Sequence, residues 1–220
     1  LTSVRDHPLL QKLRFYGSRV NLTGLETLLL SEKSKITELD IGNTMYGKSP
    51  MIGLTSVLQA LTHRSTLTEL ALRRVHLGRN EARQLGMVLY STPSLQTLVV
   101  THSYLSNNAG LAEVAPALYH NTSIKVLDLS RNKLKDMDST SLLRDILRNN
   151  KTITTLDLSR NEFGETTGAV DCIAHGLGSN STLLKIDLSR CALRDGDVST
   201  LAQTLGSRNT TLQKVSLRSN

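Results

Sequence analysis

The sequence of 220 residues is poor in several residue types, and each shortage disfavours a class of function. Aromatic residues make up 3% of the chain and tryptophan is absent. There are therefore few rings on which the bases of single-stranded nucleic acid could stack. No apolar run approaches the ~18 residues that a membrane-spanning helix requires. The sequence favours neither a nucleic-acid partner nor a membrane.

Motifs for catalysis and metal binding are also missing. The six histidines are scattered, with no His-x-x-x-His or Cys-x-x-Cys pair, so no zinc site has the required spacing. The G-x-S-x-G elbow of serine hydrolases and the G-x-G-x-x-G loop of dinucleotide sites are absent as well. We therefore expect no enzyme activity, no catalytic residue, no metal and no cofactor in this chain.

One stretch does match a nucleotide-binding motif. Residues 42–49, GNTMYGKS, fit the phosphate-loop pattern G-x-x-x-x-G-K-[ST], and they lie between a predicted strand and an apolar helical stretch. Against this interpretation, no other segment supplies a convincing aspartate for magnesium. We expect a long turn here, and phosphate binding at 42–49 is a remote alternative.

The sequence does contain an internal repeat. IKVLDLSRNKL at 124–134 returns as ITTLDLSRNEF at 153–163 and as LLKIDLSRCAL at 183–193. Such regular spacing indicates a tandem array, so we expect residues 1–220 to form a single repeat domain. Eight copies, 26 to 31 residues apart, have their first apolar residue (place 1) at Leu10, Ile36, Leu67, Leu95, Ile124, Ile153, Leu183 and Leu212.

Each copy predicts one strand followed by one helix. Apolar residues at places 4 and 6 alternate with polar residues at places 5 and 7, which is the period of a strand with one buried face. The following segments carry apolar residues at helical spacing, as at Leu143 and Ile146. We expect helices at 138–149 and 197–206, and in total eight parallel strands with about seven helices in an open arc.

The unit L-x-x-L-x-L-x-x-N/C-x-L resembles the leucine-rich repeat signature, and a period near 29 residues with a helix is similar to the ribonuclease-inhibitor type. The resemblance implies an α/β solenoid, a horseshoe with a concave parallel sheet and convex helices. Similar arrays occur in ribonuclease inhibitor, the Ran GTPase-activating protein, nucleotide-binding receptors, Roco proteins and actin regulators. The resemblance implies a protein-interaction module of a larger intracellular protein, with a GTPase activator as the alternative.

The cysteines and several asparagines fit the same interpretation. Extracellular leucine-rich arrays usually carry disulfide-bonded caps, whereas we expect Cys172 and Cys191 to be buried thiols, so a cytoplasmic or nuclear location is predicted. The chain ends at place 9 of its eighth copy, so we expect a fragment of a longer protein. Four N-x-S/T triplets recur at predicted helix exits, where we expect left-handed asparagine rather than glycosylation, at Asn121, Asn150, Asn180 and Asn209.

Place 9 is predicted to hold a buried asparagine that bonds to neighbouring turns. Asn132 and Asn161 fit this role, and Asn220 should fit it if a further repeat follows. Val75 stands at the same place and has no polar side chain. We therefore expect the turn around Val75 to be looser or differently bonded.

The predicted binding site lies on the concave face, to which places 5, 7 and 8 point. In the later copies an aspartate row at place 5 lies beside an arginine row at place 8, and we expect the two rows to offset each other's charge. In copies three and four the arginines should lose these acidic partners. The net charge of +7 permits a protein partner with an acidic surface, and the oligomeric state is left open. The candidate partner-binding residues are Arg73, Arg74, Val99, Thr101, His102, Tyr104, Arg131, Arg160 and Arg190.

Overall fold

The computed structural model describes residues 9–17, 22–43, 51–64, 66–105 and 110–220. In this part of the chain, strands and helices alternate along the sequence. The strands are β1 (Lys12–Gly17), β2 (Glu38–Asn43), β3 (Glu69–Arg73), β4 (Thr97–Thr101), β5 (Val126–Asp128), β6 (Thr155–Asp157), β7 (Lys185–Asp187) and β8 (Lys214–Ser216). The helices are α1 (Leu25–Leu30), α2 (Leu54–Leu61), α3 (Arg79–Ser91), α4 (Gly110–His120), α5 (Met137–Asn149), the 3₁₀ helix η3 (Phe163–Glu165), α6 (Ala169–Ser179) and α7 (Asp195–Arg208).

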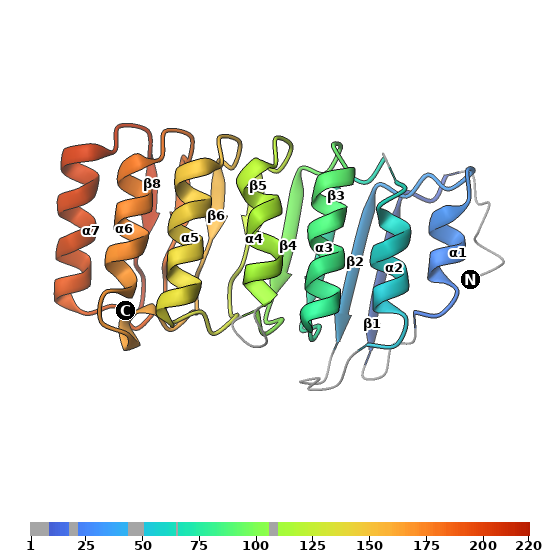
Figure 1. Ribbon diagram of the computed structural model, residues 1–220, viewed down its shortest axis with the longest axis horizontal. Helices are drawn as coiled ribbons and strands as arrows, with labels where there is room; N and C mark the ends of the chain where they lie inside the picture. Colours follow the sequence, from blue (N-terminus) through green and yellow to red (C-terminus); the bar gives the residue numbers. More distant parts are fainter. Residues whose placement is uncertain (1–8, 18–21, 44–50, 65, 106–109) are drawn as a thin grey trace.

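All eight strands form one parallel sheet, in the order in which they occur in the chain. The register is the same from repeat to repeat, so that Leu98 pairs with Leu127, Leu127 with Leu156 and Leu156 with Ile186. Figure 1 shows the α-helices as one row against the sheet, with α1 and α7 at its two ends. The predicted eight parallel strands, seven α-helices and open sheet are confirmed.

The hydrophobic core lies between the sheet and the row of helices. Places 4 and 6 of the strands point into it, as shown by Leu127 and Leu129, which are 0% and 1% exposed. The buried faces of the helices, including Leu143 and Ile146 of α5, complete the same core. No helix of the described residues covers the opposite face of the sheet, which is called the helix-free face below (Figure 1). It corresponds to the concave face of the sequence prediction.

The predicted start of α5 is displaced by a few residues. Asp136, and not Asp138, is the N-terminal cap, because its Oδ1 atom accepts a hydrogen bond from the backbone N–H of Ser139 at 2.7 Å. The helix at the last repeat also begins earlier than predicted, at Asp195, and Asp197 accepts a hydrogen bond from the Arg194 backbone N–H at 2.8 Å. Two aspartates lie near the start of each of these two helices, so the sequence alone did not show where the helix begins.

The asparagines of the N-x-S/T triplets lie at helix exits, as predicted, but the predicted left-handed geometry is wrong. Asn150 has φ −70° and ψ 131°, which is extended backbone. Its Oδ1 atom accepts hydrogen bonds from the backbone N–H groups of Thr152 and Ile153, both at 2.8 Å. Its Nδ2 atom donates to the carbonyl oxygens of Leu118 and Asn121 in the preceding repeat. Because a glycan would attach to this buried and bonded nitrogen, the folded chain has no room for one at Asn150.

A second set of asparagines at place 9 also joins neighbouring repeats. Asn161 accepts hydrogen bonds from the backbone N–H groups of Asn132 and Leu134, and donates to the carbonyl oxygen of Leu129. The predicted role of Asn132 and Asn161 is confirmed, since both are buried. Asn220 makes the equivalent hydrogen bonds to the preceding repeat. The prediction that Asn220 requires a following repeat is therefore wrong.

The turn at Val75 is bonded differently, as predicted. Val75 is 1% exposed and packs in the core, where its side chain offers no hydrogen bond. In the next repeat the place-9 residue is Ser103, whose hydroxyl donates to the carbonyl oxygen of Leu72 at 3.2 Å. A backbone bond from Leu77 N–H to the Ser103 carbonyl also links the two turns. The two repeats thus stay joined without an asparagine at this place.

Only one of the two cysteines is the buried thiol that the sequence predicted. Cys191 is 0% exposed and its Sγ atom donates to the carbonyl oxygen of Leu158 at 3.3 Å, whereas Cys172 on α6 is half-buried. Burial raises the pKa of the Cys191 thiol to about 12. Cys172 lies at the edge of the helical stripe, and Ile173 and Leu177 take its centre.

We expect iodoacetamide to alkylate Cys172 in the native protein and to leave Cys191 unmodified, because only the thiolate reacts and Cys191 is both neutral and covered. Mass spectrometry of peptides after a timed reaction measures both sites, and the urea-unfolded chain should label both. The raised pKa also means that the stability contributed by the neutral thiol is lost as the pH rises from ~8.5 towards about 12. Equal labelling rates in the native protein would contradict this prediction.

Candidate binding face

A row of three carboxylates crosses the helix-free face. Asp128, Asp157 and Asp187 occupy place 5 of consecutive repeats and pair in register across β5, β6 and β7. Each accepts a hydrogen bond at 2.8–2.9 Å from the backbone N–H two residues further on, which belongs to a serine. Burial raises the pKa of the Asp128 carboxyl, and the hydrogen bond from Ser130 partly opposes that effect. The backbone of its own strand end therefore holds each carboxylate.

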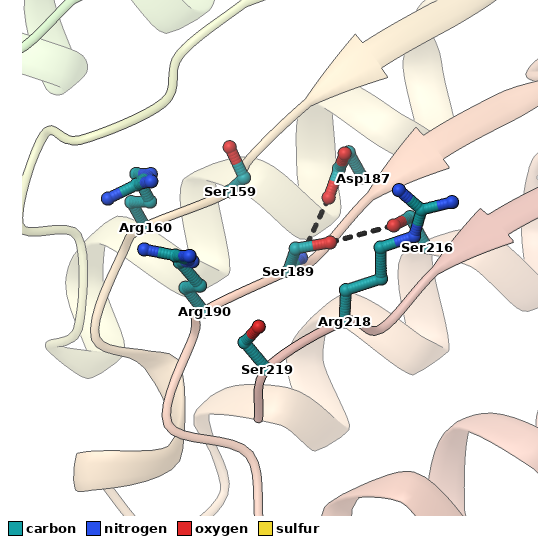
Figure 2. Close-up of a pocket in the computed structure, with 8 residues that line it drawn as sticks. All are labelled: Ser159, Arg160, Asp187, Ser189, Arg190, Ser216, Arg218 and Ser219. Carbon is teal, nitrogen blue, oxygen red and sulfur yellow. Dashed lines mark hydrogen bonds between the residues drawn. The ribbon is translucent and has the colours of Figure 1, made fainter.

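A row of arginines runs along the edge of the same face. Arg131, Arg160 and Arg190 occupy place 8, are exposed, and have φ values of 59°, 57° and 56° in the left-handed region. The backbone N–H of each donates to a carbonyl oxygen of the next repeat at 2.8–3.0 Å, which holds this conformation in place. Few residues other than glycine adopt such a φ, and the sequence pattern contained no sign of it. Side by side, Arg160 and Arg190 project from neighbouring strand ends (Figure 2).

No ion pair joins the two rows in the part of the chain that the structure describes, and the predicted offset of their charges stays a prediction. Among the ion pairs of the residues that the structure describes, none involves Arg131, Arg160 or Arg190. The pKa of Arg160 is lowered by partial desolvation and by the neighbouring charges of Arg131 and Arg190. The arginine row is therefore a strip of like charge on the surface.

At the other end of the sheet, the prediction that Arg73 lacks an acidic partner is wrong. Its Nε atom lies 3.3 Å from the Oδ1 atom of Asp40, and the Tyr16 hydroxyl donates to the Oδ2 atom of the same carboxylate. Asp40 pairs in register with Ala71, two residues before Arg73, so the carboxylate of the preceding strand lies within reach. The pattern of a single copy could not show this diagonal contact.

The remaining candidate residues of copies three and four are less exposed than predicted. Val99 is in register with Asp128, yet it is only 7% exposed. Arg74, Thr101, His102 and Tyr104 are half-buried. Burial lowers the pKa of His102, with further lowering from Arg74, Arg131 and Lys133, so His102 is neutral at pH 7.

Tyr104 lies in a cluster with His76, His102 and Lys133. Its ring centroid lies 6.1 Å from that of His76 and 5.9 Å from that of His102. The Lys133 Nζ atom lies 5.8 Å from the Tyr104 ring centroid, within the range of a cation–π interaction. Of the predicted binding residues, the cluster contains His102 and Tyr104, and it adds His76 and Lys133, which were not predicted.

The arginine row ends in a pocket of about 260 Å³ at the C-terminal repeats. Arg160, Arg190, Arg218, Asp187 and four serines line it (Figure 2). Arg218 stands at place 7 of the last copy, where the three preceding copies have serine. Arg218 was not among the predicted binding residues, because in the later copies these were the arginines of place 8, although the change from serine to arginine at place 7 is visible in the sequence.

Comparisons with known proteins agree with this architecture. The leucine-rich repeat family model matches residues 120–136, 149–166 and 179–202. Solved structures of leucine-rich repeat proteins share the fold over most of the chain. This chain has the fold of a leucine-rich repeat solenoid. The ribonuclease-inhibitor-like subtype stays a prediction.

Three solved structures show how far the similarity extends. The actin-binding site 2 fragment of leiomodin-1 is 26% identical, with a TM-score of 0.53, over 63% of this chain and 78% of that one. LegL7 of Legionella pneumophila is 18% identical, with a TM-score of 0.56, over 89% of this chain and 69% of that one. Internalin C2 of Listeria monocytogenes is 18% identical, with a TM-score of 0.50, over 94% of this chain and 80% of that one. No curated protein sequence matches the solenoid.

The predictions about metal sites, membrane-spanning helices and phosphate binding can be compared with the described residues only. There, His, Cys, Asp and Glu side chains form no group of three that could hold a metal ion, and no helix is long and apolar enough to cross a bilayer. Most of the phosphate-loop match at 42–49 lies outside the described residues, so that alternative stays untested. The packing of the sheet accounts for glycine at the first position of the match, because a Cβ atom added at Gly42 would overlap the Tyr16 ring.

Proposed function

We propose that this solenoid is a protein-interaction module that binds an acidic protein surface through the helix-free face of its sheet. The observation that carries the proposal is the arginine row, in which Arg131, Arg160 and Arg190 stand exposed on neighbouring strand ends without ion pairs inside the described chain. Clustered like charges repel each other, and a bound surface of opposite charge relieves that repulsion. Such a row also attracts an acidic partner during diffusional encounter.

The similarity to solved structures supports a protein as the partner. The leiomodin-1 fragment is named for actin binding. Actin is therefore the first single protein that we would test. A cytoplasmic or nuclear location is part of the proposal, supported by the two free cysteines of the chain. The alternative of a GTPase activator stays a prediction.

The test uses charge reversal in the arginine row. A displayed library of intracellular protein segments is selected for binding to the wild-type solenoid. The selected peptides should be rich in Asp and Glu. The double variant Arg131→Glu/Arg160→Glu should bind these peptides at least about tenfold more weakly, with slower association and a smaller dependence on salt. Biolayer interferometry at several salt concentrations measures all three quantities.

The matched control is Lys33→Glu/Lys35→Glu, which makes the same change of charge at two exposed lysines before β2. It should alter affinity by less than about twofold, because these lysines lie several strands away from the row. Recovery of no binding peptide, or equal affinity for the wild type and the Arg131→Glu/Arg160→Glu variant, would overturn the proposal. The partners would then have to bind another surface.

A further inference from the structure

The pocket at the end of the arginine row differs in chemistry from the rest of that row. Along the row, neighbouring arginines lie on successive strand ends, with serine at place 7 between them and the sheet. In the last copy Arg218 replaces that serine, so a third arginine lines the same pocket as Arg160 and Arg190. Figure 2 shows the Arg218 guanidinium group on the side of Ser216 and Asp187, apart from those of Arg160 and Arg190, which lie side by side. The last repeat thus adds a third cation on the opposite side of the pocket.

The pocket carries a net positive charge that its own residues do not cancel. Three guanidinium groups and the Asp187 carboxylate line it, which leaves a formal charge of +2. The Oδ1 atom of Asp187 already accepts the backbone N–H of Ser189 at 2.8 Å. The carboxylate lies beside the arginines without pairing with any of them, because no ion pair of the described residues includes it.

The serines of the pocket add hydrogen-bond donors. The Oγ atoms of Ser189 and Ser216 lie 2.7 Å apart, so one hydroxyl donates to the other (Figure 2). The accepting hydroxyl keeps its own hydrogen, which is available for a ligand. Guanidinium groups offer donors only, and the free hydroxyl hydrogen adds one more donor, so together they suit an oxyanion with several acceptor oxygens.

We propose that the pocket between Arg160, Arg190 and Arg218 binds the phosphate group of a phosphorylated serine or threonine in the partner protein. A phosphate monoester carries a charge of about −1.5 to −2 at pH 7 and three acceptor oxygens, which match the charge and the donors of the pocket. A carboxylate side chain carries only a single negative charge. The inference rests on the proposed function, since the phosphorylated residue belongs to the acidic protein that the arginine row binds.

The test compares two peptide libraries that differ only in one central residue, phosphoserine or serine, with all other positions degenerate. The phosphoserine library should bind the wild-type solenoid at least about tenfold more tightly. The variant Arg218→Gln should lose this preference. Arg218→Lys should regain only part of it, because lysine keeps the charge and lacks the forked donor geometry of arginine.

The matched control is Arg131→Gln, which removes a cation from the row outside the pocket. It should weaken the binding of both libraries and leave the ratio between them unchanged. Thermal unfolding of each variant checks that the fold is intact, as expected for exposed side chains. Inorganic phosphate is tested as a competitor, because a site for free phosphate would bind it as tightly as the phosphopeptides.

The outcomes separate this inference from the proposed function. Equal binding of the two libraries, an Arg218→Gln variant with an unchanged preference, or inorganic phosphate that competes as strongly as a phosphopeptide would each overturn the phosphate pocket. If acidic peptides still bind in a manner sensitive to Arg131→Glu/Arg160→Glu, the interaction module stands without it. If neither library nor the acidic peptides bind, the proposed function fails as well.

Discussion

Replacing Asn161 with alanine should lower the free energy of unfolding by about 4 kcal/mol, because it leaves several buried backbone groups without partners, at ~1–3 kcal/mol each before relaxation. The Oδ1 atom of Asn161 accepts the backbone N–H groups of Asn132 at 3.0 Å and Leu134 at 3.1 Å. Its Nδ2 atom donates to the carbonyl oxygens of Leu129 at 3.1 Å and Leu158 at 2.8 Å. The side chain is 1% exposed, so water cannot replace these bonds in the intact fold.

Urea unfolding followed by circular dichroism measures this loss. Asn149→Ala is the matched control, because the Asn149 side chain is exposed and makes one bond, to the Asp145 carbonyl of its own helix. The control should change stability by less than about 0.5 kcal/mol. Asn161→Asp should destabilise the protein at least as much as Asn161→Ala at neutral pH, since a buried carboxylate oxygen would lie against the carbonyl oxygens of Leu129 and Leu158 that now accept from Nδ2. A loss below about 1 kcal/mol for Asn161→Ala would show that the turns can relax and bond elsewhere.

Gly164→Ala should destabilise the solenoid by about 3 kcal/mol or more, because the added methyl group has no space and backbone must move to admit it. Gly164 lies in η3, and its N–H donates to the Cys191 carbonyl of the next repeat at 3.0 Å. A Cβ atom at this position would overlap the carbonyl group of Ala192 and lie 2.9 Å from the Leu193 nitrogen. Both neighbours are backbone, so a change of rotamer cannot relieve the clash.

Differential scanning calorimetry measures this effect, and hydrogen exchange locates it. Gly196→Ala on α7 is the matched control, because an added Cβ atom there has no neighbour within 4 Å. We expect the control to stabilise the protein by a few tenths of a kcal/mol up to about 1 kcal/mol, since alanine favours the helix. Faster exchange in the Gly164→Ala variant should begin at the boundary between η3 and the turn that contains Ala192. Equal midpoints for the two variants would contradict the packing argument.

The local pattern of each repeat was enough to predict the architecture. Alternation of apolar and polar residues, as in Leu127-Asp128-Leu129, predicts a strand with one buried face, and the i, i+3, i+4 spacing around Leu143 and Ile146 predicts the helix packed behind it. The similar distance between copies then favours equal register between neighbouring strands. The aspartate row at place 5 followed from the same periodicity. These features depend on residues that lie close together in one copy, so the sequence alone determined them.

The contacts between repeats were decided only in the tertiary structure. The bond partners of Asn161, the Arg73–Asp40 ion pair and the overlap that requires Gly164 all join residues about 30 positions apart, and their geometry depends on how closely neighbouring turns approach. The left-handed φ of Arg160 and the pocket that Arg218 completes depend on the same packing. A repeat pattern describes one unit at a time. It therefore determined which residues face the core, whereas the stacking of units decided which charges are paired and which remain for a partner.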